Sequence, residues 1–189
     1  MTYSADYLAE VASIAMQVHD LRLEAFAVVL AKARANHGRV FVLGVGGSAA
    51  NASHLVNDLR KIAAIEAYAP TDNVAELTAR TNDDGWDTVF VEWLQTSRLR
   101  PDDVVLVLSV GGGSMTTSAN LMNAVDYARS AGAYTLGIVA DREGFTAQHA
   151  DLCLIIPMVN PKHITPHAES FQSIIGHLLV WHPIVHSNV

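Results

Sequence analysis

The sequence predicts an α/β fold: a doubly wound, parallel, five-stranded sheet flanked by helices and preceded by an N-terminal helical arm. Three observations support this prediction. The apolar runs that suit strands are continuous, as in strands buried on both faces. Segments with helical periodicity separate these runs. Two of the runs end in glycine- and serine-rich loops that open a helix, which is where open α/β sheets bind ligands.

The N-terminal segment predicts a helical arm. Apolar side chains follow helical spacing over residues 4–35, in two segments that meet near His19-Asp20, and His37-Gly38 marks the end of the helix. Two apolar helical stripes need a partner surface, so we expect residues 1–37 to promote oligomerisation. Residues 38–189 are expected to form the α/β core of the same single domain.

Strands and helices then alternate along the core. Asp72 is expected to cap a helix, and residues 82–85 are expected to form a loop. The expected strands are residues 40–43, 64–68, 104–108, 134–139 and 152–156. The expected helices are residues 49–63, 73–80, 87–97, 115–131 and 169–181.

Composition excludes several classes of protein. The chain has 189 residues, half of them hydrophobic, with 16% charged residues and a net charge of −7, which is not the composition of a disordered chain. The acidic balance argues against nucleic acid as a partner, because nucleic-acid binding needs a basic face. Cys153 is the single cysteine, so no internal disulfide is possible. No secretory signal is visible and the apolar runs are too short for a bilayer, so we expect a cytoplasmic protein without a membrane partner.

The two loops, residues 44–48 and 109–114, predict a phosphate site. Glycine lets the backbone approach an anion, and the positive end of the following helix favours negative charge. Either loop could instead be only a tight strand–helix turn. The first loop also fits a loose dinucleotide fingerprint with Glu66 as the ribose acid, but a second serine loop argues against a nicotinamide enzyme, and no Walker lysine is present, so we expect no nucleotide cofactor. The groups expected at the phosphate site are Gly46, Gly47, Ser48, Ser109, Gly111, Gly112 and Ser114.

Histidine and carboxylate side chains follow these loops on helices. His54 and Asp58 are four residues apart and share one helix face, and Glu169 and His177 lie in one stripe of the last helix. Such a set could act as acid and base, or could hold a divalent ion. Alternatively, the histidines could be ordinary packed side chains, and Asp58 could pair in solvent with the basic residues that follow it.

Together these residues resemble a known family. Residues 41–59, with Gly-Val-Gly-Gly-Ser-Ala-Ala before His54 and Asp58, resemble the sugar isomerase (SIS) domain and in particular its phosphoheptose isomerase branch. The resemblance continues through residues 82–86, residues 108–114 and the last helix, and it covers nearly the whole chain.

The resemblance implies a single SIS domain that assembles as a homotetramer with active sites between subunits. It implies interconversion of sedoheptulose 7-phosphate and D-glycero-D-manno-heptose 7-phosphate through an enediol, for nucleotide-activated heptose of lipopolysaccharide or capsule. Phosphate would lie on Ser48, Ser109 and Ser114, while Asn82 and Asp83 would approach the sugar hydroxyls.

The resemblance also implies roles for the ionisable residues. Asp58 would be the catalytic base and His177 the acid, and a divalent metal, zinc in the family, would be held among His54, Asp58, Glu169 and His177. Asp58 stands where the family has glutamate, and Glu169 stands where it has glutamine. About 12 Å of regular helix separates Glu169 from His177, so sharing one ion requires Glu169 to precede the first regular turn or to serve another subunit.

Two alternatives within the family stay open at this point. The chain could be a non-catalytic phosphosugar-binding regulator, as in a relative that binds the bacterial replication initiator DnaA, or an isomerase of another ketose phosphate. The presence of His54, Asp58 and His177 favours an enzyme.

Overall fold

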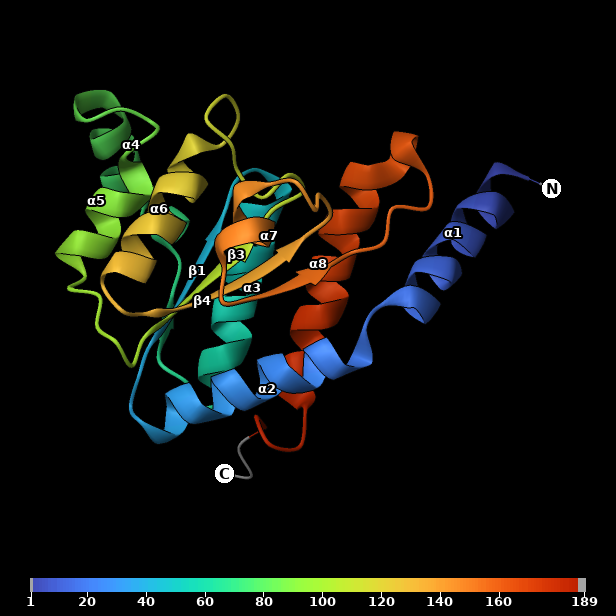
Figure 1. The fold of residues 1–189 in the computed structure, drawn as a ribbon, viewed down its shortest axis with the longest axis horizontal. Helices are drawn as coiled ribbons and strands as arrows, with labels where there is room; N and C mark the ends of the chain where they lie inside the picture. Colours follow the sequence, from blue (N-terminus) through green and yellow to red (C-terminus); the bar gives the residue numbers. More distant parts are fainter. Residues whose placement is uncertain (1, 187–189) are drawn as a thin grey trace.

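The computed structural model describes residues 2–186 and contains one parallel sheet with helices on both faces (Figure 1). The fold class and the number of strands predicted from the sequence are confirmed. The strand order is β2-β1-β3-β4-β5, so the winding direction of the chain reverses between β1 and β3. The strands are β1 (Val40–Gly44), β2 (Ala67–Tyr68), β3 (Val104–Leu108), β4 (Tyr134–Val139) and β5 (Leu152–Ile155).

Eight α-helices lie within residues 2–186, and none of them is long and apolar enough to cross a membrane. They are α1 (Tyr3–Gln17), α2 (Asp20–Ala35), α3 (Gly47–Lys61), α4 (Val74–Asp83), α5 (Val89–Thr96), α6 (Ala119–Ser130), α7 (Phe145–His149) and α8 (Ile164–Trp181). Two short 3-10 turns, η1 (Pro70–Asp72) and η2 (Pro161–His163), complete the chain.

The sheet is buried on both faces, which explains why its strands are continuously apolar. In β1, Val40 and Val42 join a core formed with α2, α3 and α8, whereas Phe41 and Leu43 join a core formed with α5 and α6. Figure 1 shows these two groups of helices on opposite sides of the strands. Successive side chains of a strand point to opposite faces, so each face supplies one core.

The start of α4 differs from the prediction. Asn73 is the N-cap, because its side chain accepts a hydrogen bond from the backbone N–H of Glu76 at 3.3 Å. Asp72, the cap expected from the sequence, instead accepts a hydrogen bond from the Ser53 hydroxyl on α3.

The end of α4 also differs from the prediction. Asn82 and Asp83, expected in a loop, form its last turn. The helix continues through them to Asp83, and the N–H of the following Gly85 bonds to the carbonyl of Arg80 at 3.1 Å.

The last helix begins earlier than predicted, at Ile164 rather than at Glu169. Pro166 lies in its first turn, where the missing N–H costs nothing because those amides have no partner within the helix. Conversely, α6 begins later, at Ala119 rather than near Met115. The preceding residues form a turn closed by a 3.1 Å bond from the Thr117 N–H to the Ser114 hydroxyl.

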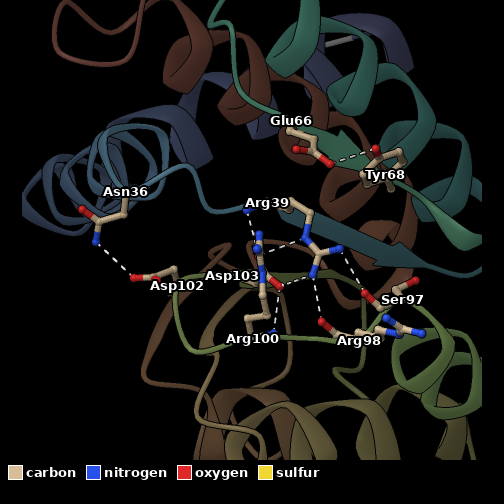
Figure 2. Close-up of polar contacts among 9 residues, drawn as sticks. All are labelled: Asn36, Arg39, Glu66, Tyr68, Ser97, Arg98, Arg100, Asp102 and Asp103. Atoms are coloured by element: carbon tan, nitrogen blue, oxygen red, sulfur yellow. Dashed lines mark hydrogen bonds and ion pairs between the residues drawn. The ribbon is translucent and has the colours of Figure 1, made fainter.

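An ion pair joins β1 and β3 at their amino ends (Figure 2). Arg39 donates from Nη2 to Asp103 at 2.6 Å, from Nε at 3.1 Å and from its backbone N–H at 2.9 Å. Burial raises the pKa of Asp103, but the hydrogen bonds from Arg39 and Arg100 outweigh this and hold the pKa below its ordinary value. The pair fixes the alignment of the two central strands.

Candidate active site

The two glycine-rich loops begin side by side at the carboxyl edge of the sheet. Gly44 at the end of β1 is in register with Leu108 at the end of β3. Gly44 has no room for a side chain, because a Cβ there would overlap the Ser48 carbonyl in the first turn of α3. This close packing places the amino end of α3 directly at the switch point, where sheets of this kind bind ligands.

At the first loop, Gly46 and Gly47 are exposed and Ser48 is buried. The carboxylate of Glu169 occupies the space where a side chain at position 47 would stand. A negative charge is favoured at a helix amino end. Glu169 therefore lies beside the amino end of α3, next to the loop that is expected to bind phosphate.

The second loop is held in shape by its own hydrogen bonds. The Ser109 hydroxyl accepts from the Gly112 N–H at 3.0 Å, and the Gly112 carbonyl accepts from the Thr146 hydroxyl at 2.6 Å. Gly112 has a φ of 73°, a conformation that favours glycine. Gly111 and Ser114 remain exposed, so this loop offers a backbone amide and a hydroxyl to an anion.

The structure brings three of the four predicted metal ligands together. His54 and Asp58 come from α3 and His177 comes from α8, which packs along α3. The Asp58 Oδ2 atom lies 3.5 Å from the Nε2 atom of each histidine, and the two Nε2 atoms are 3.4 Å apart. The Asp58 side chain is 10% exposed, whereas the histidine side chains are about half exposed (51% and 50%).

These three donors, which we call the α3–α8 cluster, fit a divalent ion. The ligands of a tetrahedral zinc ion at about 2.1 Å lie about 3.4 Å from one another, close to the separations observed. The other Asp58 oxygen accepts from the Asn57 side chain at 2.9 Å, which orients the carboxylate. The side chains could therefore hold a cation with three protein ligands and leave its remaining position for substrate.

Three other predicted residues do not reach this cluster within one chain. Glu169 lies beside Gly47, two helical turns away from His177 along α8. Asn82 and Asp83 are exposed at the end of α4, which Figure 1 shows well separated from α8.

Sequence reasoning missed two amides between the phosphate loop and the α3–α8 cluster. Asn51 of α3 donates to the Glu169 carbonyl at 2.7 Å and to the Gln172 Oε1 atom at 3.1 Å. Gln172 of α8 is buried and lines the same groove as His54, Asp58 and His177. One signal was available: Asn51 precedes His54 by about one turn, on the face that was already singled out.

A second group of histidines and a carboxylate attaches α1 to the start of α8. The Glu10 Oε2 atom accepts from His163 Nδ1 and from His167 Nε2, both at 2.8 Å, and Asn160 donates to Glu10 Oε1 at 2.7 Å. The hydrogen bonds from His167, Asn160 and His163 lower the pKa of Glu10 to about 2. Tyr7 packs on the His167 ring, with ring centroids 4.7 Å apart. We call these residues the arm cluster.

Comparison with known proteins agrees with this architecture. The SIS domain family matches residues 6–140. A phosphoheptose isomerase of Rhodospirillum rubrum is 36% identical over 161 residues, which cover 82% of this chain and 80% of that protein. A structure of a phosphoheptose isomerase from Neisseria gonorrhoeae superposes with a TM-score of 0.82 at 24% identity, covering 94% of each chain. One from Francisella tularensis gives 0.82 at 23% identity, covering 95% of this chain and 97% of that chain.

The two kinds of comparison carry different information. The solved structures show that the fold is shared, and the family match and the sequence identity show common descent over most of the chain. The chain therefore belongs to the SIS domain family, in its phosphoheptose isomerase branch.

Proposed function

We propose that this chain is an aldose–ketose isomerase that interconverts sedoheptulose 7-phosphate and D-glycero-D-manno-heptose 7-phosphate. Its relatives are named phosphoheptose isomerases. The observation that carries the proposal is the position of the α3–α8 cluster relative to the loops. His54 follows Ser48 by six residues of one helix, about 9 Å along its axis. A phosphate on the loops would therefore leave the far end of a seven-carbon sugar beside Asp58 and the two histidines.

The reaction moves one proton between neighbouring carbons. Asp58 would take the proton from C1 of the ketose, next to the C2 carbonyl, and His177 would give a proton to the carbonyl oxygen, which yields the enediol. Return of the proton to C2 and loss of the O1 proton give the aldose. The buried Asp58 carboxylate is shielded from water, whereas the half-exposed His177 ring can exchange its proton with solvent.

A divalent ion, zinc in our proposal, would be held by His54, Asp58 and His177 and would polarise the substrate carbonyl. His177 would bind the ion and donate the proton through the same Nε2 atom, so these two roles exclude each other in one turnover. Metal titration separates them. If turnover rises with bound zinc, His177 acts as a ligand, and if turnover falls on loading, His177 acts as the acid.

We further propose a cytoplasmic homotetramer in which residues 1–37 form the oligomerisation arm and residues 38–189 form the α/β core. On its side away from Tyr7 and Ile14, α1 exposes Leu8 and Met16, which are 65% and 87% exposed. Asn82 and Asp83 belong to α4, which lies well apart from α8 of the same chain (Figure 1), and this supports a site completed by a neighbouring subunit.

The test follows aldose phosphate by NMR after addition of sedoheptulose 7-phosphate to zinc-loaded and to chelated protein. We expect turnover by the parent protein and a loss of about a hundredfold to ten-thousandfold in Asp58→Asn, which is the contribution of a positioned proton-transfer group. Asp126→Asn on the exposed face of α6 is the matched control and should retain full activity. Phosphosugar binding without turnover in the parent would contradict the proposal.

A further inference from the structure

Gln172 is a buried donor whose orientation is fixed by its neighbours. The residue is 1% exposed, and among residues 2–186 its Nε2 atom has no hydrogen-bond partner. Its Oε1 atom accepts from Asn51, and the same Asn51 amide group donates to the Glu169 carbonyl. An amide group that donates to a backbone carbonyl must be NH₂, so the orientation of Asn51 is set and that of Gln172 follows from it. The free end of Gln172 is therefore its NH₂ group.

The groove that Gln172 lines has room for one small polar group. It lies between α3 and α8 with a volume of about 10 Å³, close to the space that a single water-sized group needs. His54, Ser173 and His177 form part of its wall, together with Asp58. Asp58 accepts from Asn57 at one oxygen, and its other oxygen lies 3.5 Å from the Nε2 atom of each histidine.

We propose that Gln172 is a substrate-contacting residue whose NH₂ group donates a hydrogen bond to an oxygen at the reacting end of the sugar phosphate. The inference rests on the proposed isomerase function and adds to it a donor that the family resemblance does not assign. Negative charge develops on the carbonyl oxygen as the enediol forms, and a fixed neutral donor in a water-poor site stabilises that charge. Burial of an unpaired donor costs free energy in the free protein, and the substrate oxygen removes this cost.

Asn51 is the positioning residue for this donor. Its amide holds the oxygen end of Gln172, which leaves the NH₂ group as the free end of a side chain that lines the groove. An aspartate at position 51 can only accept, so it would attract the NH₂ group and turn the Gln172 amide over. Asn51→Asp should therefore lose the donor without removing Gln172.

The experiment compares kcat, KM and Tm for the parent, Gln172→Met and Asn51→Asp, with Gln95→Met on the exposed face of α5 as the matched control. Methionine conserves volume and removes the buried donor. We expect kcat to fall on the order of a hundredfold in Gln172→Met, with KM changed less than about threefold and with Tm of the free protein unchanged or raised. Asn51→Asp should lower kcat similarly, and Gln95→Met should behave as the parent.

The possible outcomes separate this inference from the proposed function. If the parent is active and Gln172→Met retains its kcat, the inference is wrong and the isomerase function stands. A large fall in the Tm of Gln172→Met would mean that the amide makes an internal bond in the free protein, which also overturns the inference. An inactive parent overturns the proposed function, and the inference with it.

Discussion

The α3–α8 cluster and the arm cluster contain the same kinds of side chain at different separations. In the arm cluster, two histidine nitrogens lie 2.8 Å from one Glu10 oxygen, which is the length of a hydrogen bond. In the α3–α8 cluster, the three donor atoms are 3.4–3.5 Å apart, too far for strong hydrogen bonds and close to the spacing of ligands around a cation. The nitrogen–oxygen separations, 2.8 Å in the arm cluster and 3.5 Å in the α3–α8 cluster, therefore distinguish a structural contact from a candidate metal site.

The surroundings of the histidines reinforce this difference. The His167 ring is buried, and within residues 2–186 its Nδ1 atom has no partner. A metal on Nε2 would place the proton on Nδ1 and create an unpaired buried donor, whereas donation from Nε2 to Glu10 leaves Nδ1 bare. His54 and His177 are half exposed, so water can satisfy their second nitrogens. The comparison shows that residue type alone does not define a metal site.

The largest expected effect is on zinc affinity, which should depend on the α3–α8 cluster and not on the arm cluster. His54→Ala removes one of three ligands and should weaken zinc binding by more than about a hundredfold, beyond the range for loss of an outer-shell partner. The matched variant His163→Ala in the arm cluster should leave zinc affinity unchanged. Competition with a chromophoric chelator measures both. Loss of zinc from His163→Ala would show that the arm cluster also binds the metal.

A second expected effect concerns pH. Because hydrogen bonds lower the pKa of Glu10 from 4.5 to about 2, the ionised carboxylate favours the folded state. Its contribution to the free energy of unfolding is complete above about pH 4.5 and is lost as the pH falls toward 2. The stability difference between the parent and Glu10→Gln should shrink over this window, as measured by urea midpoints at several pH values. Asp126→Asn, an exposed carboxylate, serves as the control, and a difference that stays constant down to pH 2 would contradict this account.

The smallest expected effect tests whether the aromatic contact holds the arm. Tyr7→Leu retains apolar area but loses the ring contact with His167, at a cost of about 0.5–1.5 kcal/mol. Tm should fall by roughly 2–4 °C for a chain of this size. Tyr134→Leu, at an exposed position of β4 outside the arm cluster, should shift Tm less. Equal Tm values for the two variants would mean that α1 is not docked on α8 in solution.

Much of the fold could be predicted from local patterns. Continuous apolar runs such as β3 have one stable environment, the centre of a sheet covered on both faces, and the first glycine loop marks where α3 begins. Boundaries set by tertiary contacts could not be predicted. Asp72 has the chemistry of a cap but accepts from Ser53 of another helix, which no local window contains. The start of α8 was predicted at Glu169 rather than Ile164, although the first turn of a helix accepts a proline such as Pro166.

The candidate site was predictable to the extent that it depends on helical spacing. His54 and Asp58 share a face because they are four residues apart, and this holds in the structure. The placement of Glu169 depends on the position of α8 along the axis of α3. Packing over the whole interface between the two helices determines that position. Gln172 was not predictable, because its importance lies in an unpaired nitrogen and an orientation fixed by Asn51.

The Arg39–Asp103 pair has a consequence for engineering. It fastens β1 and β3 at the ends opposite the two loops, so the alignment of the strands does not depend on the loop sequences. The amino ends of the strands thus carry the ion pair that aligns them, and the carboxyl ends carry the loops that would recognise the ligand. The two loops could therefore be replaced by those of a relative that prefers another sugar without disturbing the sheet. Exchange of these two short segments should then be enough to change the sugar specificity.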